Sequence, residues 1–255
     1  MKSFTTALYV ELRKTSGSRT PRVITVLLVA GIALLTGALV AAVRAGNEQI
    51  IAELGPLIGA PGWGLLTGVA GQITAAGALL GFGAALSWSF GREFTDGTVT
   101  GLFAQPVTRP TIALAKLCIH LLWVGVVAVA MTSLLLAAGA IFGFGHPDGE
   151  ALTQLVDHGV LIILTGVIAM PAGWAATLGR GPLPGIATTL AVLVVAQVTA
   201  IAVPGGAAWM PFAAPALWAV QPEAVHLGQL LLVGTVPIAF GALICLAWQR
   251  LQLDR

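Results

Sequence analysis

Charged side chains are scarce in this sequence, in which Asp, Glu, Lys and Arg make up 9% of the 255 residues. Soluble domains carry about 25% charged residues, because their surfaces must be hydrated. Hydrophobic residues reach 57% of the sequence, against about 45–50% in an average soluble protein. These proportions exclude a soluble globular domain and indicate that the bilayer surrounds most of the chain.

Signals for catalysis and for metal or nucleotide binding are also missing. The only cysteines, Cys118 and Cys245, lie in apolar runs, so we interpret them as reduced thiols packed as small hydrophobic groups. The only lysines, Lys2, Lys14 and Lys116, do not follow a glycine, which excludes a P-loop. No Gly-x-Ser-x-Gly or His-Glu-x-x-His motif occurs. The sequence therefore predicts no catalytic residue, no standard metal site and no cofactor bound by this chain.

Long apolar runs predict an all-α membrane protein of six transmembrane helices, at about 23–43, 63–90, 112–142, 156–178, 186–204 and 227–248. With these spans, eleven of the twelve Lys and Arg residues fall on one side, and only Arg44 falls on the other. Positive residues concentrate in cytoplasmic loops. Both termini are therefore predicted to be cytoplasmic, in a single transmembrane domain over 1–255.

The segments flanking the spans have their own patterns. Within the cytoplasmic lead, 1–22, Phe4, Leu8 and Leu12 recur every fourth residue, which predicts an amphipathic helix lying in the membrane interface. The proline- and tryptophan-rich stretch 205–226 is too broken for a span, and we expect it to form an outer cap. Pro171 and Pro237 are candidate kinks in the fourth and sixth spans.

The polar segment 91–111, between the second and third spans, is the strongest functional signal. Val99, Leu102 and Phe103 would form one apolar face of a short helix that begins near Thr98. Its start would be capped by Asp96 or Thr98, and Gly97 permits the bend before it. The pattern leaves two interpretations open: the apolar face fills a groove on a soluble partner, or it packs on the membrane surface or on the chain itself.

Two prolines, Pro106 and Pro110, end this helix and direct the chain into the third span. The strings Glu93-Phe94-Thr95-Asp96-Gly97-Thr98 and Pro106-Val107-Thr108-Arg109, followed by Lys116, resemble the cytoplasmic signature of type-2 ABC transporter permeases. The layout of six spans, a leading amphipathic helix and a long second span is also similar to this family. The resemblance is closest to short permeases of bacterial antibiotic and peptide export.

This resemblance implies a permease without catalytic activity of its own, in the bacterial plasma membrane. Its expected protein partners are two copies of a separate ABC ATPase and a second permease, identical or related. The ATPase would hold ATP and Mg. The permease would also contact the lipid bilayer, and no nucleic acid is expected. The resemblance also implies a set of residues that couple the permease to the ATPase: Arg92, Glu93, Phe94, Asp96, Gly97, Thr98, Val99, Leu102, Phe103, Pro106 and Arg109.

Ionisable residues are nearly absent from the interiors of the predicted spans. This argues against a proton-driven transporter, which needs an ionisable side chain inside the membrane to hold the proton. Gln72 and Gln197 are the deepest strong hydrogen-bonding side chains, and they are candidates for a substrate path or for helix packing. Two other functions remain open from the residues alone: an ATP-independent carrier or channel, and a membrane sensor or scaffold. The substrate, and whether the second permease is identical, are not encoded in any motif.

Overall fold

A computed structural model describes residues 2–104 and 106–252, except for the side chains of Lys2, Pro56, Phe103 and Pro204. All secondary-structure elements in these ranges are helices. In chain order the elements are α1 (Lys2–Gly17), α2 (Arg19–Val26), the π-helical turn η1 (Leu27–Gly31), α3 (Ile32–Arg44), α4 (Glu48–Leu54), the 3₁₀ turn η2 (Gly55–Gly59), α5 (Trp63–Thr95), α6 (Val99–Phe103), α7 (Arg109–Ile141), α8 (Gly149–Ile168), α9 (Pro171–Leu178), α10 (Pro182–Ala202), α11 (Pro204–Ala207), α12 (Ala214–Val220), the 3₁₀ turn η3 (Pro222–Ala224), α13 (Leu227–Leu232) and α14 (Thr235–Gln249).

Within the described residues, six helical stretches are long and apolar enough to cross a membrane. This confirms the all-α fold class with six spans. The stretches run over Arg19–Arg44, Trp63–Thr95, Arg109–Ile141, Gly149–Leu178, Pro182–Ala202 and Leu227–Gln249. Their ends lie a few residues from the predicted ones at most positions, because hydropathy falls gradually where a helix extends beyond the apolar core.

Two of these spans are interrupted at the predicted kinks. The fourth breaks between α8 and α9, and α9 begins at Pro171. The sixth breaks between α13 and α14, and α14 begins at Thr235, two residues before Pro237. Proline has no N–H to donate to the preceding turn, so a helix that reaches it ends or bends there.

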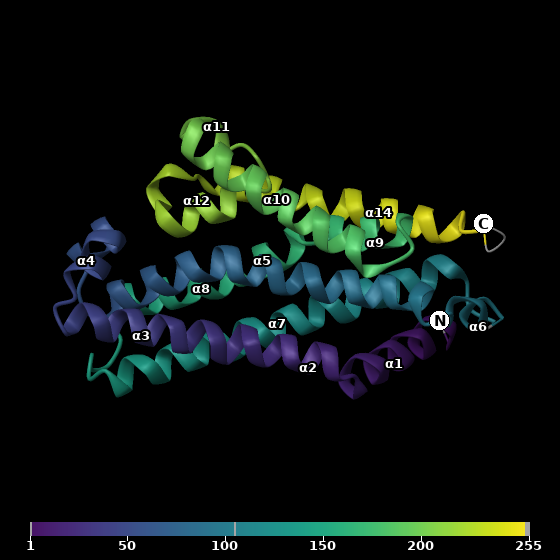
Figure 1. Cartoon of the computed structure of the whole chain (residues 1–255), viewed down its shortest axis with the longest axis horizontal. Helices are drawn as coiled ribbons and strands as arrows, with labels where there is room; N and C mark the ends of the chain where they lie inside the picture. Colours follow the sequence, from purple (N-terminus) through teal and green to yellow (C-terminus); the bar gives the residue numbers. More distant parts are fainter. Residues whose placement is uncertain (1, 105, 253–255) are drawn as a thin grey trace.

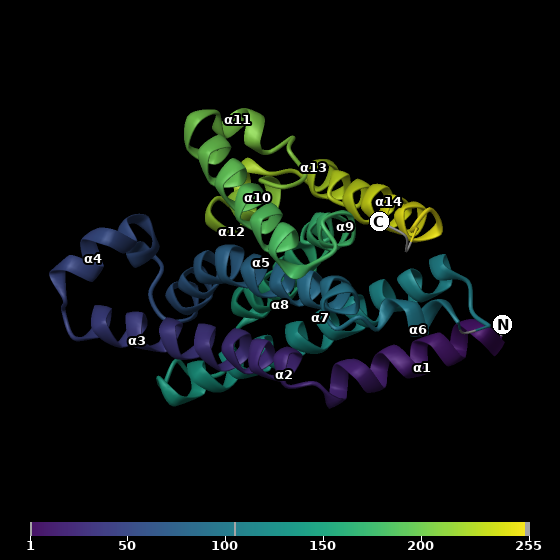
Figure 2. The ribbon, with the colours of Figure 1, turned by 45° about the vertical axis from the view of Figure 1, so that its right-hand side comes forward.

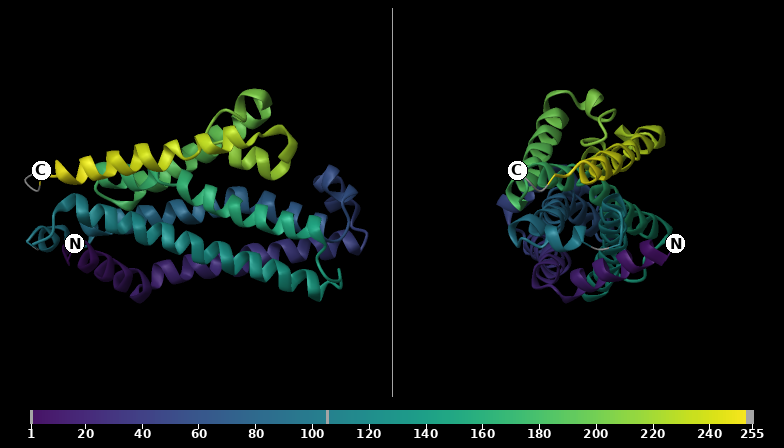
Figure 3. Two further views of the ribbon diagram at one scale, coloured as in Figure 1. Left: turned by 180° about the vertical axis from the view of Figure 1, so that it is seen from behind. Right: turned by 90° about the vertical axis from the view of Figure 1, so that its right-hand side faces the viewer.

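The helices lie along one long axis, with α5 in the middle of the bundle (Figure 1). Both termini and α6 lie at one end of this axis, called here the termini end, whereas α4, α11 and α12 lie at the opposite end, called the distal end (Figures 1 and 3). An even number of crossings requires this arrangement. Figure 2 shows α10 and α14 on one side of the bundle, and α1 to α3 on the other.

Side chains of neighbouring helices pack directly against glycines of α5. A Cβ atom added at Gly81 of α5 would come within 2.6 Å of Leu28 Cδ2 in η1, and one added at Gly83 would come within 2.2 Å of Thr189 Oγ1 in α10. Small residues allow such contacts where lipid supplies no hydrophobic driving force between helices. Gly77 and Gly81 are four residues apart, a spacing that favours such close contact.

Candidate functional site

The bend at Gly97 and the start of α6 agree with the sequence prediction. Helix α5 ends at Thr95, Gly97 takes φ +67°, and α6 starts at Val99. Glycine adopts this left-handed conformation without a steric penalty, so the chain reverses there. Helix α7 then starts at Arg109 with Pro110 in its first turn, a position where no N–H is needed.

Neither predicted cap of α6 acts as one. Thr98 occupies the N-cap position, but its side chain makes no capping hydrogen bond. Its hydroxyl donates instead to Glu93 Oε2 at 2.5 Å. Asp96 is the residue that follows α5, and its carboxylate pairs with Arg92 at 3.5 Å. Both polar groups are drawn toward charges on α5, which attract them more strongly than neutral backbone N–H groups do.

The apolar face of α6 is turned into the chain. Val99 is 8% exposed and Leu102 is 6% exposed. Leu102 belongs to the main hydrophobic core with Ile112 of α7, and it shares a small cavity with Ala7 of α1. The interpretation of an open face for a partner groove is therefore wrong for Val99 and Leu102. The side chain of Phe103 lies outside the described part of the structure.

The surface that α6 does present is small and polar. Thr98, Thr100, Gly101 and Ala104 are exposed, as is Gly97 before them. A Cβ atom added at Gly101 would meet no atom within 4 Å. A partner that binds α6 in this arrangement would contact these residues.

A cluster of four charges holds the turn to α1 and α7. It consists of Glu11 and Lys14 of α1, Glu93 of α5 and Lys116 of α7, and is called here the four-charge cluster. Lys116 Nζ lies 2.8 Å from Glu11 Oε2 and 2.8 Å from Glu93 Oε1. Lys14 Nζ lies 3.0 Å from Glu11 Oε1 and 3.0 Å from Glu93 Oε1. Three separate helices are thus joined by alternating charges.

The cluster is buried, balanced and hydrogen-bonded. The side chains of Glu93 and Lys116 are each 1% exposed. Lys116 also donates to the carbonyl of Ser89 at 3.1 Å, and the Thr98 hydroxyl donates to Glu93. Burying charges is costly unless each one is paired and its remaining hydrogen-bonding capacity is used. This cluster meets both conditions, with two cations and two anions.

Lys14 is the most exposed member and remains charged. Burial alone would lower the pKa of Lys14, but the carboxylates of Glu11 and Glu93 outweigh burial and raise it. A raised pKa in the folded state means that the stabilisation is present below the ordinary value of about 10.4, and is lost only as pH rises through the raised pKa. At neutral pH the pairing is therefore complete.

Sequence reasoning found half of this cluster. The family resemblance includes Glu93 and Lys116, whereas no sequence motif singles out Glu11 and Lys14 of the leading helix. In the structure, α1 turns Ala7 and Glu11 toward α7, while Tyr9 and Leu12 are 59% and 43% exposed. Of the predicted stripe, Phe4 and Leu8 are partly buried and Leu12 is exposed; its place in the membrane interface stays a prediction.

Other predicted coupling residues lie around the same turn. Arg92 stacks over the Trp88 ring at 4.5 Å and donates to the Ser18 hydroxyl at 3.1 Å, which ties α5 to the junction of α1 and α2. Phe94 packs half-buried against the main core.

The loop before α7 contacts a different part of the chain. Pro106 is exposed there. Arg109 donates a short hydrogen bond to the carbonyl of Leu251, just after α14. Arg92 and Arg109 thus connect the turn between α5 and α7 to two opposite ends of the sequence.

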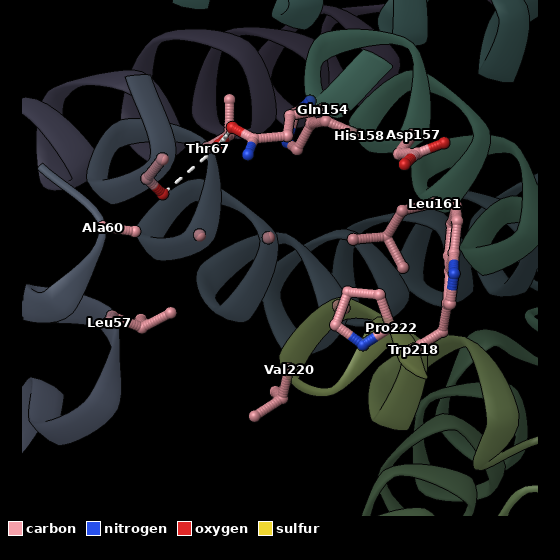
Figure 4. A pocket seen from close by; sticks show the side chains of 14 residues that line it. Leu57, Ala60, Thr67, Gln154, Asp157, His158, Leu161, Trp218, Val220 and Pro222 are labelled. Atoms are coloured by element: carbon pink, nitrogen blue, oxygen red, sulfur yellow. Dashed lines mark hydrogen bonds between the residues drawn. The ribbon is translucent and has the colours of Figure 1, made fainter. Parts of the chain in front are cut away.

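The two glutamines proposed for a substrate path do not come together at a site. Gln72 is half-buried on α5, and Gln197 is exposed on α10. Neither lines the cavity of about 180 Å³ that lies near the distal end between α5, α8 and α12 (Figure 4). The polar side chains in that cavity come instead from Thr67, Gln154, Asp157 and His158.

Metal-ligating side chains are dispersed over the described ranges, 2–104 and 106–252. No three His, Cys, Asp or Glu residues in these ranges come close enough to hold a metal ion. Cys118 and Cys245 are both half-buried free thiols.

Residues 73–197 match a family model described as ABC-2 family transporter protein. The matched segment begins within α5 and ends within α10, so it includes α6 and two members of the four-charge cluster, Glu93 and Lys116. No curated protein and no solved structure matches the chain.

Proposed function

Since the chain belongs to the ABC-2 transporter family through residues 73–197, we propose that it is the membrane permease subunit of an ATP-binding cassette exporter. The observation that carries the proposal is the family match, which spans the turn between α5 and α7. The permease moves a drug, peptide or lipid-like substrate outward, and a separate ATPase binds ATP and Mg and supplies the energy.

In the proposed orientation the termini end is cytoplasmic and the distal end is external. Arg13 belongs to α1, Arg92 to the last turn of α5 and Arg109 to the first turn of α7, and Arg180 and Arg250 follow α9 and α14, whereas Arg44 ends the first span just before α4. A bias of Lys and Arg toward one side of the membrane marks the cytoplasmic side. The α6 turn would then project toward a soluble ATPase.

The working unit is proposed to contain two permeases and two ATPase subunits. Helices α10 and α14 would offer a contact surface for the second permease, with exposed apolar side chains such as Leu190, Val194 and Ile238. In a bilayer such side chains face either lipid or another membrane helix.

Force from the ATPase would enter through the exposed residues of α6. The four-charge cluster would then carry it into three helices at once, since α5 and α7 are the second and third spans and α1 leads into the first. Buried, mutually paired charges resist separation. The turn would therefore move together with α1, α5 and α7 as one unit.

The test is to isolate the tagged full-length chain from its own membrane and to identify proteins that co-purify in stoichiometric amounts. We expect an ABC ATPase, and we expect ATP hydrolysis by that ATPase to change when the chain is reconstituted with it in liposomes. Solute movement by the chain alone, driven by a pH gradient without ATP, would instead support an ATP-independent carrier.

A further inference from the structure

The cavity near the distal end has one polar wall and otherwise apolar walls (Figure 4). Gln154, Asp157, His158 and Leu161 line it from α8. Residues three and four apart share one face of a helix, so α8 presents this whole set on one side. Trp218 of α12 and Pro222 of η3 contribute apolar surface from the loop region after α10.

Two polar groups of this wall lack a partner. Asp157 makes no hydrogen bond and no ion pair within the part of the chain that the structure describes. His158 is 4% exposed, and its Nε2 lies 3.0 Å from the Thr74 hydroxyl, but its Nδ1 is buried without a hydrogen-bond partner. Buried polar atoms in native proteins are nearly always paired, so an unpaired one calls for an explanation.

The Nδ1 atom of His158 exposes no surface to the cavity, so Asp157 is the unpaired group that a ligand can reach. A protonated amine would neutralise the Asp157 carboxylate, which is half-buried against apolar surface. The indole of Trp218 belongs to the same cavity, and aromatic rings attract cations through their faces. A carboxylate or phosphate ligand would be repelled by Asp157.

The volume limits the size of the ligand. An apolar protein cavity of about 150 Å³ is large enough to hold benzene, and this cavity measures about 180 Å³. We propose that the cavity binds a small amphiphile composed of a protonated amine and an apolar group about the size of one aromatic ring.

This site lies within a single chain, and its lining residues require no second permease or ATPase. The assignment of the cavity to the external side of the membrane rests on the proposed function, but the binding reaction does not. Under that function, the site would take cationic amphiphiles from the external side or hold them as they leave.

The experiment measures binding of 2-phenylethylamine to the purified full-length chain in lipid nanodiscs, by ligand-observed NMR titration. The matched neutral probe is 2-phenylethanol, which has the same ring and chain without the charge. The test variant is Asp157→Asn, which keeps the shape of the side chain. The control variant is Glu53→Gln, because Glu53 is an exposed carboxylate of α4 that does not line the cavity. Empty nanodiscs measure partition into lipid.

We expect the wild-type chain to bind the amine at least tenfold more tightly than the alcohol. Asp157→Asn should remove this preference and leave thermal stability equal or higher, since it deletes an uncompensated charge. Glu53→Gln should keep the preference. Equal binding of the two probes, binding that does not exceed the empty nanodiscs, or a preference that survives Asp157→Asn would each overturn the proposal. Because no ATPase is present, such a failure would leave the proposed transport function standing, and failure of ATP-dependent coupling would leave this binding result standing.

Discussion

At the scale of single residues, the side chains of Glu93 and Lys116 are held in place by opposite charges on three helices. Each carboxylate contacts two ammonium groups, and each ammonium contacts two carboxylates. Removing one member leaves an excess buried charge of the opposite sign. The cluster is therefore sensitive to single substitutions in a way that exposed ion pairs are not.

Glu93→Ala tests this sensitivity. It leaves Lys14 and Lys116 sharing the single carboxylate of Glu11, and removal of one partner from a buried pair costs about 3–5 kcal/mol of stability. The matched control, Asp96→Ala, removes a half-exposed carboxylate three residues later, and should change stability by about 0–1 kcal/mol. Thermal unfolding of the purified chain in detergent measures both.

A second variant separates charge balance from packing. If charge balance is the cause, adding Lys116→Met to Glu93→Ala should recover part of the lost stability, since it removes the excess cation. Interaction energies between contacting residues are about 0.5–3 kcal/mol. Strictly additive losses in the double variant would count against the cluster as the source of the effect.

At the scale of elements, one side of α6 is buried against the chain and the other is exposed. Its inner side, Val99 and Leu102, packs on the chain, and its outer side, Thr98, Thr100, Gly101 and Ala104, is exposed. Five residues are too few for a helix to be stable alone, so the position of α6 depends on this packing. An ATPase would contact the outer side while the inner side keeps the helix attached.

Two neighbouring substitutions distinguish these sides. Leu102→Ala should lower the stability by about 2–5 kcal/mol, because it opens a cavity in the core. Gly101→Arg has room for its side chain, and should leave stability unchanged or slightly higher, because glycine is about 0.8–1 kcal/mol less favourable than alanine in a helix, whereas arginine ranks close to alanine. It should nevertheless reduce ATPase capture in a pull-down and ATP hydrolysis by the complex.

The outcome for Gly101→Arg decides whether α6 is the coupling element. Full ATPase capture together with full hydrolysis would show that the exposed side of α6 is not a contact surface. Gly149→Arg, the same substitution at an open glycine that starts α8 and lies away from α6, is the control, and it should affect neither measurement.

At the scale of the whole molecule, the helix bundle places both termini and α6 at one end. The proposal that this end faces the cytoplasm rests on the distribution of arginine and lysine. The two cysteines, half-buried in α7 and α14, can be replaced by serine to give a background for labelling.

Orientation is tested by single cysteines at Gly149, Gly205 and Thr95. The two glycines have open space around a Cβ atom and lie toward the distal end, whereas Thr95 is exposed at the end of α5. Intact cells treated with an impermeant thiol reagent should be labelled at 149 and 205 but not at 95, and opened cells should be labelled at all three. Labelling of Thr95→Cys in intact cells would reverse the proposed orientation.

The sequence by itself determined the spans, the helix breaks and the turn before α6. Six apolar runs define the spans, Pro171 and Pro237 mark the breaks, and Gly97 marks the turn before α6. Each of these features depends on residues that are close together in the chain: the length of an apolar run, a missing N–H group, or a left-handed φ angle.

Only the tertiary structure decided which residues meet. Lys14 pairs with Glu93 across 79 positions, and Glu11 pairs with Lys116 across 105. The same packing turned Leu102 inward, left Gln197 outside and brought Asp157 to a cavity beside Trp218. Helical periodicity tells which residues share a face, but not which neighbour that face meets. Glu11 and Lys14 of α1 form a buried contact because Glu93 of α5 and Lys116 of α7 supply the opposite charges.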